Sequence, residues 1–215
     1  SFPTRRSSDL TRLEAALRER NRLLADPAEP DPVWLDAIEV QIAETGVMVT
    51  QARLMMVRRL ERALEDLPEA PFARPSLRYL PGGPVVQAEL AIALRDGRSR
   101  DRAAQRTLTG PHRDELAVTM AGKDQPAAAC STGEQKAMLI AITLAHAGLL
   151  SGERPRLLDE VAAHLDPVRR EALFDRLREG SAQIWLTGTE IAPFEAIMGE
   201  AAVWRVAGGA VERVS

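Results

Sequence analysis

The sequence has 215 residues, of which 45% are hydrophobic, and a formal net charge of −3 at pH 7. This length and hydrophobic content suffice for one sizeable core or two small ones. No run of about 18 or more apolar residues occurs, which excludes a membrane-spanning helix, and the negative charge argues against a uniformly basic surface, so that nucleic-acid contacts would come from local patches.

The first ten residues, SFPTRRSSDL, differ in pattern from the rest of the chain. They contain no apolar core or small-residue cleavage site of a secretory signal, and they match neither an amphipathic helix nor a strand. Two interpretations stay open. Residues 1–9 are either a non-native stretch joined to the gene product or a disordered native terminus.

Two amphipathic helices are predicted next, and together they form a helical arm over residues 10–70. The first helix covers residues 10–25, where leucines recur at helical spacing. The second covers residues 33–67, with Asp31 as its N-cap and Gly46 as a possible bend. Because prolines and a Gly82-Gly83 pair come after it, the arm should end there, and the remaining domain is placed at residues 71–215.

Short strand-like segments come after this boundary. They are expected at residues 77–80, 85–94, 116–120 and 125–130, with a hairpin turn at 121–124. Helices and strands then alternate, which predicts a parallel α/β sheet. The expected order is helix 133–150, strand 156–158, helix 167–179 and strand 183–186, before a closing hairpin of 201–206 and 211–214.

Three segments in this last part combine residues that suit phosphate and metal chemistry: Ser131–Lys136, Leu157–Glu160 and His164–Asp166. A Ser/Gly turn that opens a long helix presents unpaired backbone N–H groups and the positive end of the helix dipole, as a phosphate requires. Asp159 and Glu160 are expected at the C-terminal end of a strand, where ligands bind in open α/β sheets. Asp159 could hold a water of Mg²⁺, while Glu160 orients or deprotonates an attacking water.

Each of these segments also has a purely structural explanation. Ser131 and Glu134 have the spacing of a helix capping box. Asp166 followed by Pro167 is a good start for a helix. Since all the segments occur together and in one order, the functional interpretation is favoured over coincidence.

Three hallmark segments of the RecF family of ABC/SMC-like DNA-repair ATPases resemble parts of this sequence: Gly110–Leu116 (GPHRDEL), Cys130–Ala137 (CSTGEQKA) and Leu157–Asp166 (LLDEVAAHLD). The arm is similar as well, through Arg20–Leu24 and Trp34–Asp36. The resemblance implies an α/β fold: an ABC-type ATPase head with an incomplete parallel sheet and flanking helices, plus an N-terminal helical arm.

The resemblance also implies a role for each matching residue. The signature loop, which in this family completes the nucleotide site of the opposite subunit, would consist of Ser131, Thr132, Gly133, Glu134 and Gln135. Asp159 would be the Walker B residue that binds the metal, Glu160 the catalytic carboxylate and Asp166 the D-loop aspartate at the nucleotide.

The implied cofactors are ATP and Mg²⁺, and ATP would hold two heads together as a homodimer on DNA. The family works in the cytoplasm with RecO and RecR, and helps RecA load at gaps and single-strand/double-strand junctions in recombinational repair and the SOS response. A reducing cytoplasm also suits a chain whose only cysteine is Cys130.

The sequence departs from the family pattern because no Gly-x-x-x-x-Gly-Lys-Ser/Thr segment occurs. A P-loop supplies hydrogen bonds of roughly 1.5–3 kcal/mol each, so its absence should weaken ATP binding at least about a thousandfold. We expect this chain alone neither to bind ATP usefully nor to hydrolyse it.

A second departure comes after strand 183–186. Related ATPases often carry a switch histidine there, but Thr187 stands in its place, so a γ-phosphate sensor must be a hydroxyl or backbone group.

Several residues keep two interpretations. His112 and Arg113 lie near nucleotide or DNA, or in a polar turn satisfied by carboxylates. The arginines of residues 95–106 contact phosphate, or form a solvated helix face paired with neighbouring aspartates. Cys130 and His146 are interpreted as packing residues.

Two other functions compete with the favoured one. Another SMC-like ATPase is disfavoured by the Gly110–Leu116 segment and the short arm. A non-catalytic dimerisation or partner-binding module would be unaffected by Glu160→Gln, whereas in a complete ATPase this change should trap the ATP-bound dimer.

Overall fold

The computed structural model describes residues 5–28, 30–65, 74–149, 155–162, 165–179 and 182–214. The chain forms two compact units: unit 1 is Ser1–Glu61 with Leu77–Val118, and unit 2 is Arg62–Ser76 with Thr119–Ser215. The predicted domain boundary at residue 70 lies outside the described residues.

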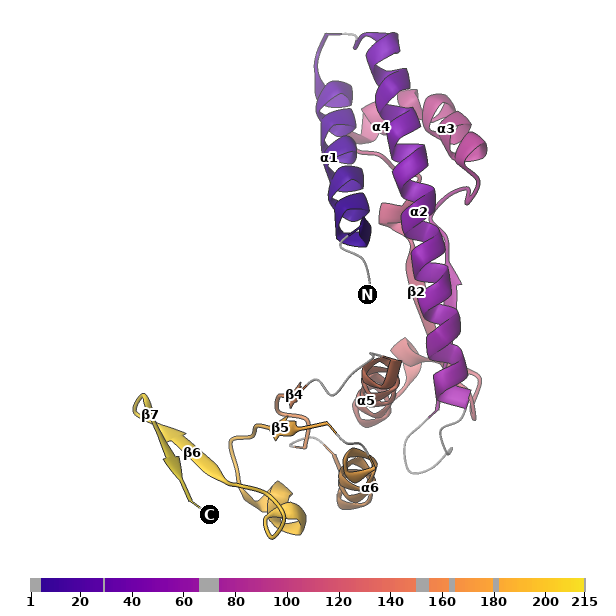
Figure 1. Ribbon diagram of the computed structural model, residues 1–215. Helices are drawn as coiled ribbons and strands as arrows, with labels where there is room; N and C mark the ends of the chain where they lie inside the picture. The colour runs from indigo at the N-terminus through magenta and orange to yellow at the C-terminus, as the bar shows by residue number, and fades with distance from the viewer. Residues whose placement is uncertain are drawn as a thin grey trace. The chain divides into compact units, whose positions relative to one another are not determined.

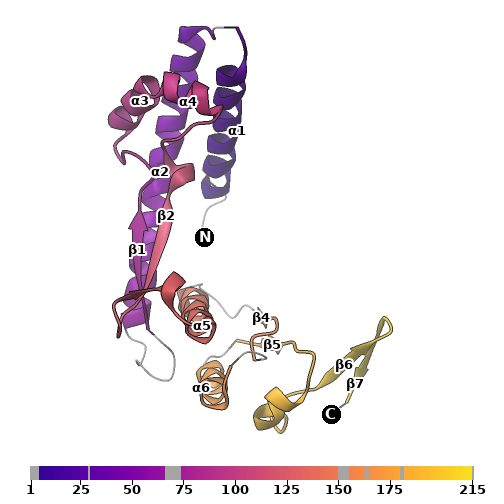
Figure 2. The same cartoon turned by 180° about the vertical axis from the view of Figure 1, so that it is seen from behind.

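Unit 1 is built on two helices, α1 (Arg5–Ala25) and α2 (Pro32–Glu65), which lie side by side in both views (Figures 1 and 2). Asp31 caps α2 as predicted, because its Oδ1 accepts a hydrogen bond of 2.8 Å from the Val33 N–H. The helix continues through Gly46, where a side chain would lie 3.1 Å from the Pro111 ring.

The core of unit 1 joins α1 and α2 to a third helix, α3 (Gln87–Asp96). Its buried residues are Leu13, Ala16, Leu17, Leu23, Leu24, Leu35, Ile38, Ile42, Ala43, Val49, Leu90 and Leu94. These positions recur at helical spacing, which confirms the amphipathic arm predicted from the sequence.

Two sequence predictions in unit 1 are wrong. The first helix was predicted to begin at residue 10, but α1 begins at Arg5, so residues 5–10 are helical. Residues 1–4 lie outside the described part of the chain. Residues 87–94 are helical and not a strand. A strand would bury Ile92 on the same face as Leu90 and Leu94, but Ile92 is 58% exposed.

Short elements complete this part of the chain: α4 (Arg98–Ala104), the 3₁₀ helix Pro111–Arg113, and a three-stranded sheet of order β1 (Pro75–Leu80), β2 (Glu115–Met120) and β3 (Gln125–Pro126). Strands β2 and β3 are antiparallel, as the predicted hairpin requires. The predicted strand 125–130 is too long, because a 3₁₀ helix, Ala127–Ala129, comes after Pro126, which has no N–H to extend a ladder.

The predicted alternation in unit 2 is confirmed. Its elements are α5 (Thr132–Leu149), β4 (Arg156–Leu158), α6 (Pro167–Arg178), β5 (Ile184–Leu186), the 3₁₀ helix Ala192–Ile197, and a hairpin of β6 (Trp204–Ala207) and β7 (Ala210–Arg213). Strands β4 and β5 are parallel, with Leu158 opposite Leu186.

Helices α5 and α6 bury one face of this parallel pair. The core consists of Ala162, Leu165, Leu173, Phe174 and Leu177, against which pack Ile140, Leu144, Leu158, Ile184 and Leu186 among others. Strand side chains alternate between faces, so Leu157 and Trp185 point the other way and are 72% and 49% exposed.

No helix in the described ranges is long and apolar enough to span a bilayer.

Candidate functional site

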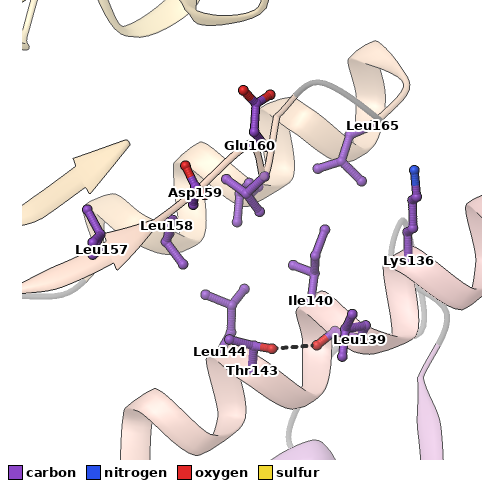
Figure 3. Close-up of a pocket in the computed structure, with 12 residues that line it drawn as sticks. Lys136, Leu139, Ile140, Thr143, Leu144, Leu157, Leu158, Asp159, Glu160 and Leu165 are labelled. Atoms are coloured by element: carbon purple, nitrogen blue, oxygen red, sulfur yellow. Dashed lines mark hydrogen bonds between the residues drawn. The ribbon is translucent and has the colours of Figure 1, made fainter. Parts of the chain in front are cut away.

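The two acidic residues of the predicted site come directly after β4, at the C-terminal end of a parallel strand. They border a pocket of about 410 Å³ between β4 and α5 (Figure 3). Lys136 lines it from α5, together with apolar side chains such as Ile140 and Leu144. In Figure 3 the carboxylates of Asp159 and Glu160 point away from these apolar side chains. The predicted placement at a strand end is therefore confirmed.

A third residue ties this acidic strand end together. Thr187 is the first residue after β5, and its hydroxyl donates a hydrogen bond to Oδ1 of Asp159. The Thr187 hydroxyl oxygen also accepts a hydrogen bond of 3.3 Å from the backbone N–H of Glu160. Glu160 adopts a left-handed conformation, with φ of 52°, which non-glycine residues rarely do. Such backbone strain is common at functional sites.

The predicted signature loop, residues 131–135, forms a turn at the start of α5 (the signature turn), and this turn is a complete capping box. Oε2 of Glu134 accepts hydrogen bonds of 2.9 Å from both the backbone N–H and the hydroxyl of Ser131, whose Oγ accepts a 3.3 Å bond from the Glu134 N–H. The other oxygen of Glu134 pairs with Lys123 at 2.6 Å. Lys123 and the two Ser131 donors lower the pKa of Glu134 from 4.5 to about 2. The structural interpretation of Ser131 is thus realised.

Gly133 and Asp166 both lie near the guanidinium of Arg169. Asp166 caps α6 by accepting from the Arg169 N–H at 3.0 Å, and it also pairs with the Arg169 guanidinium at 2.8 Å. The same guanidinium would lie 3.9 Å from a side chain at Gly133. The Arg169 N–H is the largest cause of a lowered pKa at Asp166. The signature turn and the predicted D-loop aspartate are therefore close neighbours.

The remaining signature residues are placed by α5 itself. Thr132 is the first residue of the helix, and the side chain of Gln135 donates to the carbonyl of Cys130 at 3.1 Å. Within the described ranges no hydrogen bond or ion pair links the signature turn to Asp159 or Glu160. His164 lies outside the described residues. The structure thus separates two groups of predicted site residues.

The acidic strand end suits a hard cation that arrives with phosphates. Asp159 is exposed and Thr187 is beside it, so both offer oxygen ligands. In the part of the chain that the structure describes, no group of three or more His, Cys, Asp or Glu residues could hold a metal. Mg²⁺ does not need such a cage, because it commonly binds one or two carboxylates plus substrate phosphates and waters.

The structure shows partners for His112 and for the arginine cluster of residues 95–106, while a role of either near nucleotide or DNA stays a prediction. The ring of His112 lies 2.8 Å from the Thr107 carbonyl, so its partner is the backbone and not a carboxylate. Arg98 pairs with Asp36 and Glu39 of α2, at 2.6 Å from each. The arginines of this cluster were expected to pair with neighbouring aspartates, but Arg98 pairs with carboxylates of another helix.

Further arginines of this cluster also have partners, since Arg102 donates to the carbonyls of residues 26–28 and Arg100 to Thr109. Cys130 is buried, as predicted. The interpretation of His146 as a packing residue is wrong, because it is exposed on α5.

The GPHRDEL segment contains an anchor that sequence reasoning missed. Asp114 accepts hydrogen bonds from Arg53 at 2.9 Å, from the Gly82 N–H at 2.8 Å and from the Tyr79 hydroxyl. Burial, together with the bond to Asp114, raises the pKa of Tyr79. A side chain at Gly82 would collide with the Arg113 backbone at 2.5 Å, which explains the glycine. The three contacts of Asp114 therefore hold the turn in place.

The fold matches that of a solved protein, although no family model matches the sequence. The structure of "the recombination mediator protein RecF-ATP in RecFOR pathway" superposes with a TM-score of 0.80 at 18% identity, over 100% of this chain and 60% of that chain. The fold is therefore that of the corresponding part of an ABC-type ATPase head with a helical arm.

The sequence is similar to several proteins that share one name. The chain is 49% identical over 211 residues to the DNA replication and repair protein RecF of Brucella abortus, covering 91% of this chain and 54% of that protein. RecF of Mesorhizobium japonicum is 46% identical and that of Caulobacter vibrioides 42%. The chain is a homologue of RecF over nine tenths of its length, and it spans about half the length of these relatives.

Proposed function

We propose that this chain is the part of a RecF-type replication and repair ATPase that supplies a signature turn and an acidic strand end to an ATP-dependent dimer. The observation that carries the proposal is the position of Asp159 and Glu160 at the end of parallel strand β4, at a pocket that Lys136 also lines, in a chain 49% identical to a RecF. Ligands bind at this end of open α/β sheets.

The two carboxylates have separate tasks in this proposal. Asp159 is exposed and oriented by Thr187, so it would hold Mg²⁺ or one of its waters. The Glu160 carboxylate makes no hydrogen bond or ion pair within the described residues and points away from the apolar side chains of the pocket that Glu160 helps to line. Glu160 would therefore orient and deprotonate the water that attacks the γ-phosphate. The metal would neutralise charge on the phosphates.

The signature turn would bind the phosphate of a nucleotide held by the opposite head. Its donors are the backbone N–H and hydroxyl of Ser131 at the positive end of α5. Glu134 occupies both donors here, so a phosphate has to displace its carboxylate. Lys123 pairs with the other oxygen of Glu134 and can retain the carboxylate after displacement.

The finer parts of the proposal come from the RecF resemblance. The assembled protein would bind DNA at gaps and single-strand/double-strand junctions as a homodimer and act with RecO and RecR. It would support RecA loading and the SOS response in the cytoplasm. The solved relative is named as a recombination mediator in the RecFOR pathway with ATP, which supports this placement.

A chimera tests the proposal directly. Residues 10–215 replace the matching half of Brucella abortus RecF, whose remaining half supplies whatever this chain lacks. The chimera should hydrolyse ATP and bind gapped DNA in an ATP-dependent way. Glu160→Gln should lower kcat roughly 10²–10⁴-fold and trap an ATP-bound dimer, seen by analytical ultracentrifugation. Glu171→Gln on the exposed surface of α6 is the matched control. Equal behaviour of the two variants would reject catalysis by this site.

A nucleotide titration of the isolated chain is the second test. Without P-loop hydrogen bonds, ATP affinity should be at least about a thousandfold weaker than in a complete head. Isothermal titration calorimetry with Mg-ATP should therefore detect no micromolar binding. A micromolar Kd would refute this expectation.

A partner-binding module is the second candidate function. The exposed Leu157 and Trp185 pair on the outer face of β4 and β5 favours it, because parallel sheets usually have both faces covered. This candidate gains support if the chimera keeps its DNA and protein binding after Glu160→Gln while no ATP-trapped dimer forms.

A further inference from the structure

The strongest arrangement that the proposed function leaves unexplained is centred on Thr187. Parallel pairing places this residue opposite the acidic strand end, because Leu186 is in register with Leu158. The Thr187 N–H extends the ladder with a 3.1 Å hydrogen bond to the Leu158 carbonyl. Thr187 thus bonds three consecutive residues of the other strand, 158–160.

The hydroxyl of Thr187 uses its one donor hydrogen and one of its two acceptor lone pairs. It donates to Oδ1 of Asp159 and accepts from the Glu160 N–H at 3.3 Å. One oxygen atom therefore fixes the side chain of the first acidic residue and the backbone of the second. A β-branched side chain restricts the χ1 angle, which makes threonine better suited to this than serine.

The backbone of Glu160 needs such support. Its φ of 52° lies in the left-handed region, where a Cβ is disfavoured and which persists only when the surroundings enforce it. Among the described residues, the Thr187 hydroxyl is the partner that holds this peptide N–H. The resulting turn sends the Glu160 carboxylate away from Ile140 and Leu144 of the apolar pocket (Figure 3).

We propose that Thr187 is a positioning residue that presets the acidic strand end for a Mg²⁺–nucleotide ligand, by orienting Asp159 and by holding Glu160 in its left-handed turn. This inference rests on the proposed function for its ligand, but its geometry can be tested without nucleotide. Oδ1 of Asp159 is engaged by Thr187, which leaves Oδ2 and both Glu160 oxygens without a partner within the described ranges. The open oxygens are those that a cation or water would meet.

The test compares Thr187→Val, which removes only the hydroxyl, with Thr187→Ser, which keeps it. The control is Thr189→Val, two residues along, where the side chain has no hydrogen bond in the described part of the chain. Hydrogen exchange of the Glu160 amide and the carboxyl ¹³C signal of Asp159 are measured by NMR on the 215-residue chain. Thr187→Val should raise the exchange rate roughly tenfold and shift the Asp159 signal. Thr187→Ser should restore both, and Thr189→Val should change neither.

A double-variant comparison keeps the test decisive. Glycine adopts positive φ freely, so Glu160→Gly removes the backbone cost that Thr187 offsets. The Tm change caused by Thr187→Val should therefore shrink to less than half in the Glu160→Gly background. Equal Tm changes in both backgrounds, or a Thr187→Ser variant that behaves like Thr187→Val, would overturn the proposal. If Thr187→Val does not fold, Thr187→Ser decides alone: the exchange rate of the Glu160 amide and the carboxyl signal of Asp159 should match those of the unsubstituted chain.

The two proposals fail separately. Absence of the Thr187 hydrogen bonds in these NMR measurements, with an active chimera, would reject the role of Thr187 only. Intact Thr187 hydrogen bonds in a chimera that is insensitive to Glu160→Gln would reject the proposed ATPase function and leave the local geometry standing.

Discussion

The two units differ in where they place their charges. Unit 1 buries a full ion network: Arg20 is 0% exposed, Glu39 2% and Asp101 0%. In the described residues of unit 2 the buried side chains are apolar, and its motif charges, such as Asp159 and Asp166, stay exposed. A buried charge needs fixed partners, because it has lost the water that would otherwise solvate it. The difference indicates that the charges of unit 1 hold the fold, while those of unit 2 remain accessible for binding.

Arg20 is the centre of the network in unit 1. It donates to Glu39 at 3.0 Å, to Asp101 at 2.7 Å, to Thr107 at 2.8 Å and to the Leu94 carbonyl at 2.7 Å. It thereby ties α1 to α2, to α3 and to α4. The next residue, Asn21, accepts from the Thr107 N–H and hydroxyl. The RecF-like Arg20–Leu24 segment is thus explained by packing.

Removal of Arg20 should have the strongest effect on stability. Arg20→Ala removes an ion-pair partner from two buried carboxylates, Glu39 and Asp101, of which Glu39 keeps Arg98, and should destabilise unit 1 by about 3–5 kcal/mol. Hydrogen exchange by mass spectrometry should show lost protection in α1 and α2, with α5 and α6 unchanged. Arg22→Ala is the control, since Arg22 pairs with Glu19 at the surface, and it should cost under about 1 kcal/mol. Equal effects of the two variants would contradict a structural role of the buried charge.

The apolar core of unit 2 gives the reciprocal prediction. Leu173 is fully buried on α6 beside Phe174 and Leu177. Leu173→Ala should destabilise unit 2 by about 2–4 kcal/mol through lost burial and the cavity left behind. Val168 lies on the same helix and is 65% exposed, so Val168→Ala should change stability by less than about 0.5 kcal/mol. Urea unfolding monitored by Trp185 fluorescence measures both changes in stability. Hydrogen exchange measures α1 in the same variants, and loss of its protection in Leu173→Ala would contradict separate units.

A smaller effect separates capping from function at Asp166. Its Oδ1 accepts from the Arg169 N–H, so Asp166→Ala should cost about 1 kcal/mol of stability. Asp166→Ser keeps a capping oxygen and should restore most of that stability. If Asp166 also serves the nucleotide site, Asp166→Ser should still reduce ATPase activity of the chimera. Full activity of the serine variant would leave capping as its whole role.

The weakest effect concerns pH at the signature turn. The pKa of Glu134 is lowered to about 2, so its contribution to stability is present above pH 4.5 and is lost as the pH falls toward 2. Lys123→Ala removes the largest cause and should raise this pKa, so that the loss begins at higher pH. A carboxyl NMR titration checks the shift, with Lys136→Ala as control. An unchanged Glu134 titration in Lys123→Ala would contradict the pairing.

Much of the fold was accessible from local sequence pattern. Helical leucine spacing predicted the arm, and alternation of strands and helices predicted the parallel pair β4 and β5. The strand at 85–94 was wrong because Leu90 and Leu94, four residues apart, share a face in a helix and in a strand alike. Only the exposure of Ile92 separates the two.

For the site, the sequence was enough to predict the acidic pair, the Ser131–Glu134 spacing and the start of α6 at Asp166, because strand ends and helix caps depend on residues close in sequence. Only the tertiary structure showed that Thr187, 27 residues beyond Glu160, holds its backbone, that Arg169 pairs with Asp166 close to Gly133, and that Arg20 is buried. These contacts join distant residues, and their geometry exists only after the strands pair and the helices pack.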